Sequence, residues 1–270
     1  MLPGGKAVPA TCSLKGLYKK SRERVNIMKI RNIYLGKGIP FFCIAMTVLC
    51  IAVTLISQLI PSTYMAFRFV YPMKYPWQAV SYIFLQGIPG ELLPANYPYS
   101  SMQLTIGHMG YNLLLVIPFG VLAEKIIGTK KMLILFGTTC ILDLIANLIM
   151  GAIYTKNGDM FSVAGASGIA FTFMPVGMYA LFLLGKNFGF GKLFKQVSFY
   201  VLMGMAIPTA VISLTPRIGD VAGVPSMVIH LMGLIIGSVF VVVFRKSLQG
   251  FFDKEKALKN AEFVNTPQTV

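Results

Sequence analysis

Six long apolar runs constrain this sequence more than any other feature. Each is long enough to cross a hydrocarbon core of about 30 Å as a helix, and lipid-exposed backbone must satisfy its own hydrogen bonds, which favours helices. The chain is also 56% hydrophobic and only 12% charged, which is too apolar for a water-soluble domain of this size. We therefore expect an all-α membrane protein with six transmembrane helices. The runs lie near residues 39–60, 102–123, 132–154, 163–185, 197–215 and 222–244.

The lysines and arginines predict the orientation, because cytoplasmic loops collect them. If the N-terminus is cytoplasmic, 20 of the 24 basic side chains lie inside. Both termini are then cytoplasmic, and most of the net charge of +15 reflects this asymmetry. Attraction to anionic lipid head groups explains the basic N-terminal arm more simply than nucleic-acid binding, so no nucleic-acid partner is expected. The four basic residues left outside are Arg68, Lys74, Lys156 and Arg217.

Three regions follow from this topology. Residues 1–38 form a basic cytoplasmic arm, 39–245 the six-helix membrane domain, and 246–270 a cytoplasmic tail. The first run follows the polar arm and is too long for the apolar core of a cleaved signal peptide, so it should remain in the product. Residues 61–101 hold six of the fifteen prolines and ten aromatic residues. This external loop should lie in the membrane interface, or serve only as a packed tether.

Little in the sequence suggests disulfides or bound cofactors. Cys12 falls in the arm, and Cys43, Cys50 and Cys140 fall in apolar runs, so we interpret them as packing residues. There is no cluster of metal ligands, and neither a metal nor another cofactor is expected.

Both histidines of the chain fall inside apolar runs. At about 1.5 Å per helical residue, His108, Ser167 and His230 lie roughly 8 to 13 Å below the external surface, and Asn112 shares the face of His108 one turn deeper. Ionisable residues in the membrane are functional candidates that generally face the bundle interior. The plainer alternative for each histidine is a hydrogen bond to a neighbouring backbone carbonyl.

Ser167 needs a base to become a nucleophile, and His230 is the base available at the same level. Gly165 and Gly168 let the backbone bend and a neighbouring helix approach. A helix that starts near Ser167 would also point free N–H groups at an anion formed on an attacked carbonyl. Taken alone, the glycines and serine are equally an ordinary close-packing pattern.

The sixth run contains HLMGLIIG at residues 230–237. Gly233 and Gly237 lie three and seven residues beyond His230, so they permit the sixth helix to approach the fourth closely. This approach would bring the imidazole within reach of Ser167.

Three motifs together resemble the rhomboid intramembrane serine proteases. HMGYN at 108–112 resembles the family's HxxxN, GASG at 165–168 its GxSG, and HLMGLIIG at 230–237 its HxxGxxxG. AEKIIG at 123–128 and PWQAVSYIFLQG at 76–87 also resemble family segments. The similarity covers roughly residues 39–245 and implies a rhomboid-like six-helix bundle.

The resemblance also implies the roles of individual residues. Ser167 would be the nucleophile and His230 the general base and then the acid. His108, Asn112 and the Ser167 backbone N–H would form the oxyanion hole. Relatives cut transmembrane helices after a small residue, and their fifth helix and cap loop are thought to move for substrate to enter.

Several positions depart from the family pattern. Gln78 stands where an arginine is common, and Gln103 where an additional histidine often lies. Phe171 stands where a tyrosine often stacks on the base histidine, so it can stack but has no hydroxyl. Asp143 and Asn147 in the third run are explained most simply by a packing hydrogen bond.

We therefore expect an integral, multi-pass protein of the cell (plasma) membrane that hydrolyses single-span or multi-span membrane-protein substrates through a Ser-His dyad. A polar cavity open to the outside is also expected. The first alternative is a catalytically inactive rhomboid-like protein that binds transmembrane clients. The second is a small channel or transporter with proton-relaying histidines, although matched halves with broken helices are not evident. The sequence does not indicate an oligomeric state.

Overall fold

The computed structural model describes residues 38–95, 97–215 and 223–265, with side chains described as far as residue 254. Six helical spans in these residues are long and apolar enough to cross a membrane, and each overlaps one of the predicted runs. The all-α fold with six spans is thus confirmed, while the orientation of the termini stays a prediction. The spans are α2 (Phe41–Leu59), α5 to α6 (Ser101–Ile127), α7 (Thr129–Lys156), α8 (Ser167–Phe188), α10 (Val197–Leu214) and α11 (Gly223–Asn265, of which Gly223–Lys254 counts as the span).

The second span is not a single regular helix. It consists of α5 (Ser101–Leu115), a π-helical turn η3 (Val116–Gly120) and α6 (Val121–Ile127). Pro118 lies within the π-helical turn, and a proline in a helix interior removes one hydrogen bond and crowds the preceding turn. The wider turn is the local distortion that accommodates it.

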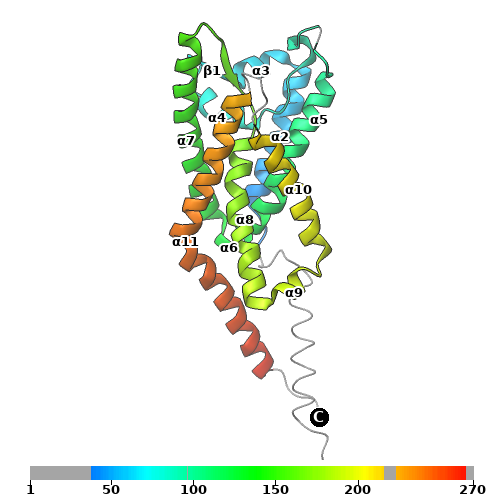
Figure 1. Ribbon diagram of the computed structural model, residues 1–270, viewed down its shortest axis with the longest axis vertical. Coiled ribbons are helices and arrows are strands. Elements are labelled where there is room, and N and C mark those ends of the chain that lie inside the picture. The colour runs from blue at the N-terminus through cyan, green and yellow to red at the C-terminus, as the bar shows by residue number, and fades with distance from the viewer. Residues whose placement is uncertain (1–37, 96, 216–222, 266–270) are drawn as a thin grey trace, which may run out of the picture.

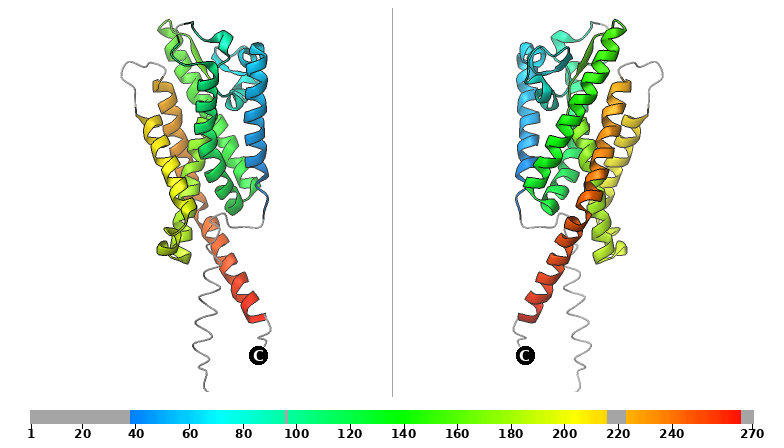
Figure 2. Two further views of the ribbon diagram at one scale, coloured as in Figure 1. Left: turned by 90° about the vertical axis from the view of Figure 1, so that its right-hand side faces the viewer. Right: turned by 90° about the vertical axis from the view of Figure 1, so that its left-hand side faces the viewer.

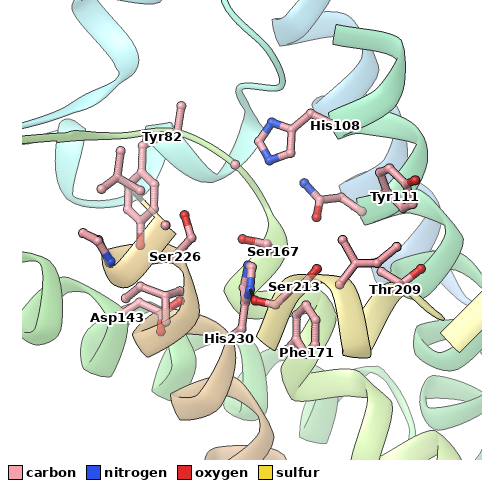
Figure 3. Close-up of a pocket in the computed structure, with 18 of the residues that line it drawn as sticks. Tyr82, His108, Tyr111, Asp143, Ser167, Phe171, Thr209, Ser213, Ser226 and His230 are labelled. Carbon is pink, nitrogen blue, oxygen red and sulfur yellow. Dashed lines mark hydrogen bonds between the residues drawn. The ribbon is translucent and has the colours of Figure 1, made fainter. Parts of the chain in front are cut away.

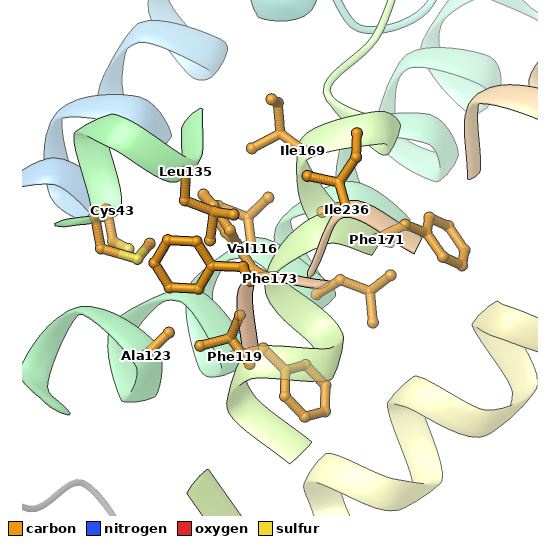
Figure 4. Close-up of a cluster of buried hydrophobic side chains, with 14 of the residues drawn as sticks. Cys43, Val116, Phe119, Ala123, Leu135, Ile169, Phe171, Phe173 and Ile236 are labelled. Carbon is orange, nitrogen blue, oxygen red and sulfur yellow. The ribbon is translucent and has the colours of Figure 1, made fainter. Parts of the chain in front are cut away.

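Helix α8 occupies the centre of the bundle, surrounded by the other spans (Figures 1 and 2). In α8, 72% of the most apolar stretch is buried inside the protein, whereas in α10 only 17% of the corresponding stretch is buried. Phe173 of α8 and Phe119 of η3 are fully buried in the core that fills this centre (Figure 4). As expected, three cysteines are free and buried in packing positions, and Cys12 lies outside the described residues.

A buried carboxylate ties α6 to the start of α2. The Glu124 oxygens accept the backbone N–H groups of Phe42 and Cys43, each at 2.9 Å, and the Thr129 hydroxyl at 2.7 Å. The first N–H groups of a helix have no partner within it and carry partial positive charge. Glu124 therefore both caps α2 and fixes its position against the second span.

The segment between α2 and α5 packs against one end of the bundle, which we call the loop end. It contains α3 (Pro61–Phe67), β1 (Phe69–Tyr71), α4 (Gln78–Ser81), and the 3-10 turns η1 (Tyr82–Phe84) and η2 (Gly90–Leu92). Strand β1 pairs antiparallel with β2 (Phe161–Val163), with Phe69 opposite Val163. Figure 1 shows α3, α4 and β1 gathered beside the ends of the long helices. The sheet thereby ties this segment to the residues that precede α8.

At the opposite end, the short α9 (Phe190–Leu193) connects α8 towards α10, and α11 extends well beyond the bundle (Figures 1 and 2). Helix α11 runs without a break through residue 246, where the tail was expected to begin. Leu248 and Phe252 are fully buried, and the Lys131 ammonium donates a hydrogen bond to Ser247. The first part of the expected tail is therefore a continuation of the sixth span. The predicted arm lies, but for residue 38, outside the described residues.

Candidate active site

A cavity of about 470 Å³ lies near the loop end, between α5, α7, α8, α10 and α11. Ser167, His230, His108 and Asn112 all line it (Figure 3). The sequence assigned these four side chains to three different spans at a similar depth. The structure brings all four together.

The backbone before α8 holds Ser167 at the start of a helix. Gly165 has a φ of +133°, a conformation that side chains with a Cβ rarely adopt, and its N–H donates to the Tyr82 carbonyl at 2.9 Å. Helix α8 then begins at Ser167 itself. The first N–H groups of α8 therefore lie beside the serine without intrahelical partners, as the sequence predicted.

Close packing of α11 on α8 brings His230 to the same place. A Cβ at Gly233 would lie only 2.5 Å from the Gly168 carbonyl oxygen, and one at Gly237 would collide with the Thr172 carbonyl oxygen. Only glycine at both positions permits this approach. The α8 and α11 pair has the most extensive contact in the structure, in agreement with the predicted role of the two glycines.

Two contacts fix the imidazole of His230. Its ring stacks on Phe171, with ring centroids 4.4 Å apart and planes 19° from parallel. Its Nδ1 lies 3.1 Å from the Ser213 carbonyl oxygen at the end of α10. Because a carbonyl oxygen only accepts hydrogen bonds, Nδ1 carries the proton of the neutral ring, and Nε2 keeps a free lone pair. His230 is thus oriented as a base.

His108 has the opposite tautomer. The Gly87 N–H donates to Nδ1 of His108 at 3.2 Å, so in the neutral ring the proton is on Nε2. That Nε2 faces the backbone before Ser167, since a Cβ at Gly165 would lie 2.9 Å from it. His108 therefore presents a hydrogen-bond donor to the cavity, where His230 presents an acceptor.

The residue that holds Asn112 was not predicted from the sequence. The Nδ2 atom of Asn112 donates to Gln86 Oε1 at 2.6 Å, and Gln86 Nε2 in turn donates to the Ile83 carbonyl at 3.2 Å. One Asn112 N–H is used in this way and the other remains for a ligand. Gln86 is a buried polar residue in an apolar stretch before α5, and this position in the sequence could have indicated that it pairs with another buried polar group.

The loop between α2 and α5 is therefore more than a tether. It supplies the Tyr82 carbonyl, the Gln86 side chain and the Gly87 N–H to the backbone and side chains of the site. Each of these contacts fixes one group beside Ser167.

Two departures from the family pattern have structural explanations away from the cavity. Gln78 accepts the backbone N–H groups of Lys74 and Tyr75 at 2.9 and 3.1 Å, and so closes a turn before α4. Gln103 forms a capping box with Ser100 at the start of α5. Neither side chain lines the cavity.

The packing hydrogen bond predicted for Asp143 is not formed at Oδ1, whereas the Asn147 side chain lies within hydrogen-bonding reach of the Tyr82 hydroxyl. Both side chains are buried, and Asp143 Oδ1 has no hydrogen-bond partner among the described residues. Asp143 instead lines the cavity (Figure 3). Its carboxylate lies so close to Gly168 that a Cβ there would collide with it.

The arrangement suits attack on a carbonyl group. It combines a hydroxyl, an imidazole lone pair, and donors from His108, Asn112 and the start of α8 around one cavity. Ser167 and His230 are not hydrogen-bonded to each other, but catalytic hydrogen bonds often tighten only when substrate binds. In the part of the chain with described side chains, no three His, Cys, Asp or Glu residues are grouped to hold a metal.

A comparison with curated proteins gave no match. A comparison with protein-family models matched residues 99–247 to the rhomboid domain. This match covers more than half of the chain and includes all four candidate site residues. The chain is therefore an integral, multi-pass membrane protein that belongs to the rhomboid family.

Proposed function

We propose that this protein is an intramembrane serine protease that hydrolyses peptide bonds in or near transmembrane segments of other membrane proteins. The family, whose members are usually intramembrane proteases, supports this proposal. The position of the cavity within a six-span bundle favours substrates that reach it from the lipid bilayer. The expected topology places the cavity towards the outside of the cell membrane.

The first step forms an acyl-enzyme. Nε2 of His230 accepts the proton of the Ser167 hydroxyl as Oγ attacks the carbonyl carbon of the scissile bond. The developing oxyanion accepts hydrogen bonds from His108 Nε2–H, the Asn112 amide and the Ser167 backbone N–H. Protonated His230 then donates its Nε2 proton to the leaving nitrogen, and the C–N bond breaks.

The second step releases the product. Water attacks the acyl carbon while His230 accepts its proton, and the Ser167 ester bond breaks with return of that proton to Oγ. No carboxylate is needed behind the base, because the Ser213 carbonyl and Phe171 orient the imidazole. The dyad is held by a backbone acceptor and a stacked ring.

The observation that carries the proposal is the complementary state of the two histidines. Gly87 leaves His108 with a donor towards the site, and Ser213 leaves His230 with an acceptor. A pair of histidines that only stabilised the bundle would not need opposite tautomers on either side of a serine. A base beside the nucleophile and a donor beside the oxyanion are what acyl transfer requires.

A fluorophosphonate probe, which reacts with activated serines, tests the proposal on the purified full chain. We expect labelling of the wild type and its loss in Ser167→Ala and His230→Ala. Ser226→Ala is the matched control, because Ser226 also lines the cavity and should not be needed for labelling. Cleavage of single-span substrates in proteoliposomes should follow the same pattern. A folded protein that is neither labelled nor active would instead favour a rhomboid-like binder of transmembrane clients.

A further inference from the structure

Three lysines at the end of the bundle opposite the loop end take no part in the mechanism above. Lys130 and Lys131 lie in the first turn of α7, and Lys246 lies in α11. Lys130 and Lys246 are exposed, and Lys131 is half-buried. None of the three forms an ion pair with a carboxylate among the described residues. Cations without a counter-ion in the chain are candidates for binding an anion from outside it.

One contact brings these lysines together from two helices. The Lys131 ammonium donates a hydrogen bond to the Ser247 hydroxyl and lies 5.7 Å from the centroid of the Phe244 ring. The start of α7 is therefore in contact with the turn of α11 that contains Lys246. We call Lys130, Lys131, Lys246 and Ser247 the lysine cluster. Three positive charges held in one small region repel one another, and a bound anion would relieve that repulsion.

The carboxylates described at this end of the bundle are engaged elsewhere. Glu124 is buried and accepts the first backbone N–H groups of α2. Asp253 accepts a hydrogen bond from the Gln249 amide at 3.1 Å. Arg245, directly before Lys246, adds a further positive charge to the same turn of α11. The lysine cluster thus lies in a region of uncompensated positive charge.

Two rows of exposed aliphatic side chains lead from the lysine cluster along the bundle. One row lies four and eleven residues after Lys130 in α7, and the other lies three and seven residues before Lys246 in α11. These spacings keep each row on the helix face of its lysine. The two helices are in contact with each other, and all four side chains are 55 to 66% exposed. The rows consist of Ile134 and Ile141 in α7 and of Val243 and Val239 in α11.

We propose that the lysine cluster and the two aliphatic rows bind one anionic phospholipid. The phosphate oxygens accept hydrogen bonds from the ammonium groups, and the Ser247 hydroxyl can donate another while it accepts from Lys131. The acyl chains lie along the aliphatic rows, which a free anion would leave uncovered. This combination of cations and adjoining apolar surface therefore favours a lipid over a free phosphate ion.

The expected topology agrees with this assignment. It places the lysine cluster at the cytoplasmic leaflet, where anionic lipids bind basic pockets between transmembrane helices. Ser247 follows His230 by 17 residues of one helix, which is about 25 Å along its axis. The lipid site is therefore separate from the candidate active site and does not depend on the proposed function.

Native mass spectrometry of the purified full chain in a neutral detergent tests the proposal, because the lipid-bound fraction gives a Kd. The probe is dioctanoyl phosphatidylglycerol, and dioctanoyl phosphatidylcholine, which has the same chains without net charge, is the reference lipid. Each cation near an anionic head group contributes roughly fivefold to binding. We therefore expect the wild type to bind phosphatidylglycerol at least 25-fold more tightly than phosphatidylcholine. The double variant Lys130→Gln with Lys246→Gln should raise the Kd for phosphatidylglycerol about 25-fold.

A second double variant separates a specific site from general attraction. Lys192→Gln with Lys195→Gln removes the same charge from exposed positions at the same end of the bundle, in and beside α9. It should change the Kd for phosphatidylglycerol less than about threefold. Lys130→Arg with Lys246→Arg keeps the charges and should bind about as tightly as the wild type. Thermal unfolding and elution volume check that each variant is folded.

Three results would overturn the lipid site. The first is an equal loss of affinity in the two glutamine variants, which would show attraction to the whole basic end of the molecule. The second is equal binding of phosphatidylglycerol and phosphatidylcholine by the wild type. The third is displacement of phosphatidylglycerol by an equal concentration of inorganic phosphate, which would show that the lysine cluster binds an ion and that the aliphatic rows contribute nothing.

Discussion

The α8 and α11 pair and helix α10 border the same cavity but are held very differently. In α8, 72% of the most apolar stretch is buried and the helix packs against α11 through glycines, whereas in α10 only 17% of that stretch is buried. Ser167 and His230 both come from the tight pair, and α10 contributes the Ser213 carbonyl that accepts from His230. The distance between Ser167 and His230 is therefore set by the tightly packed α8 and α11 pair. The position of the proton on His230 Nδ1 instead depends on the loosely packed α10.

The largest effect is expected where the tight pair is forced apart. In Gly237→Val, the new side chain would collide with the Thr172 carbonyl, so α11 must move away from α8. A displacement of about 1 Å should lower the rate of fluorophosphonate labelling roughly 100-fold or more. Gly204→Val in α10 is the matched control, because a Cβ at Gly204 meets no atom within 4 Å. Equal rates in both variants would contradict the contrast between the two regions.

The second-largest loss of activity is expected when Asn112 loses the side chain that holds it. Gln86→Leu removes the acceptor of the Asn112 amide, so the expected oxyanion donor loses its fixed direction. Loss of one such donor costs on the order of 10²–10³ in kcat, and a misdirected donor should cost less, about tenfold to 100-fold. The kcat for a transmembrane substrate is the measurement. Gln86→Glu, which keeps an acceptor oxygen, should restore part of the rate, and failure of any rescue would argue for a packing role alone.

The third-largest effect is expected from the Phe171 ring that stacks on His230. Phe171→Leu keeps apolar volume but removes the flat ring under His230, and should lower the labelling rate about twofold to tenfold, since aromatic stacking contributes about 0.5–1.5 kcal/mol. Phe173→Leu, at an equally buried position of α8 outside the cavity, controls for loss of core packing. Phe171→Tyr keeps the stack and should label at close to the wild-type rate. A slower rate in Phe173→Leu than in Phe171→Leu would mean that packing, not the stack, is being measured.

The smallest effect is expected on α10 itself. Gly204→Ala adds a methyl group in open space and favours the helix by about 0.5–1 kcal/mol. Because α10 supplies no reacting side chain, the labelling rate should change by less than about twofold while thermal stability rises slightly. A tenfold change would show that the mobility of α10 limits the reaction.

Much of the fold was predictable from the sequence, because a membrane span is specified locally by a long apolar run. Ser167, His108, Asn112 and His230 were also recognisable, since polar side chains at one depth in different spans are rare and their motifs resemble a known family. The irregular second span was not foreseen, although Pro118 was the available signal.

The rest of the site depends on contacts that leave no pattern in the sequence. The carbonyl of Ser213 and the N–H of Gly87 are backbone groups, and any residue type carries them. Gln86 comes from an aperiodic loop, so its proximity to Asn112 appears only once the chain has folded. The partners of Asp143 and Asn147 could not be predicted for a related reason, because whether a buried polar group finds a partner is decided by the neighbouring segments.

The π-helical turn at Val116–Gly120 allows one span to serve two unrelated polar neighbourhoods. Before the turn, in α5, His108 and Asn112 face the cavity; after it, in α6, Glu124 caps α2. The extra residue in that turn sets the rotation of the lower half relative to the upper half. Deleting a single residue there would hardly shorten the span. It would nonetheless rotate one half of the span relative to the other, so that either Glu124 or the pair of His108 and Asn112 would face the lipid acyl chains. The number of residues in this turn therefore couples the site at one membrane face to the capping of α2 at the other.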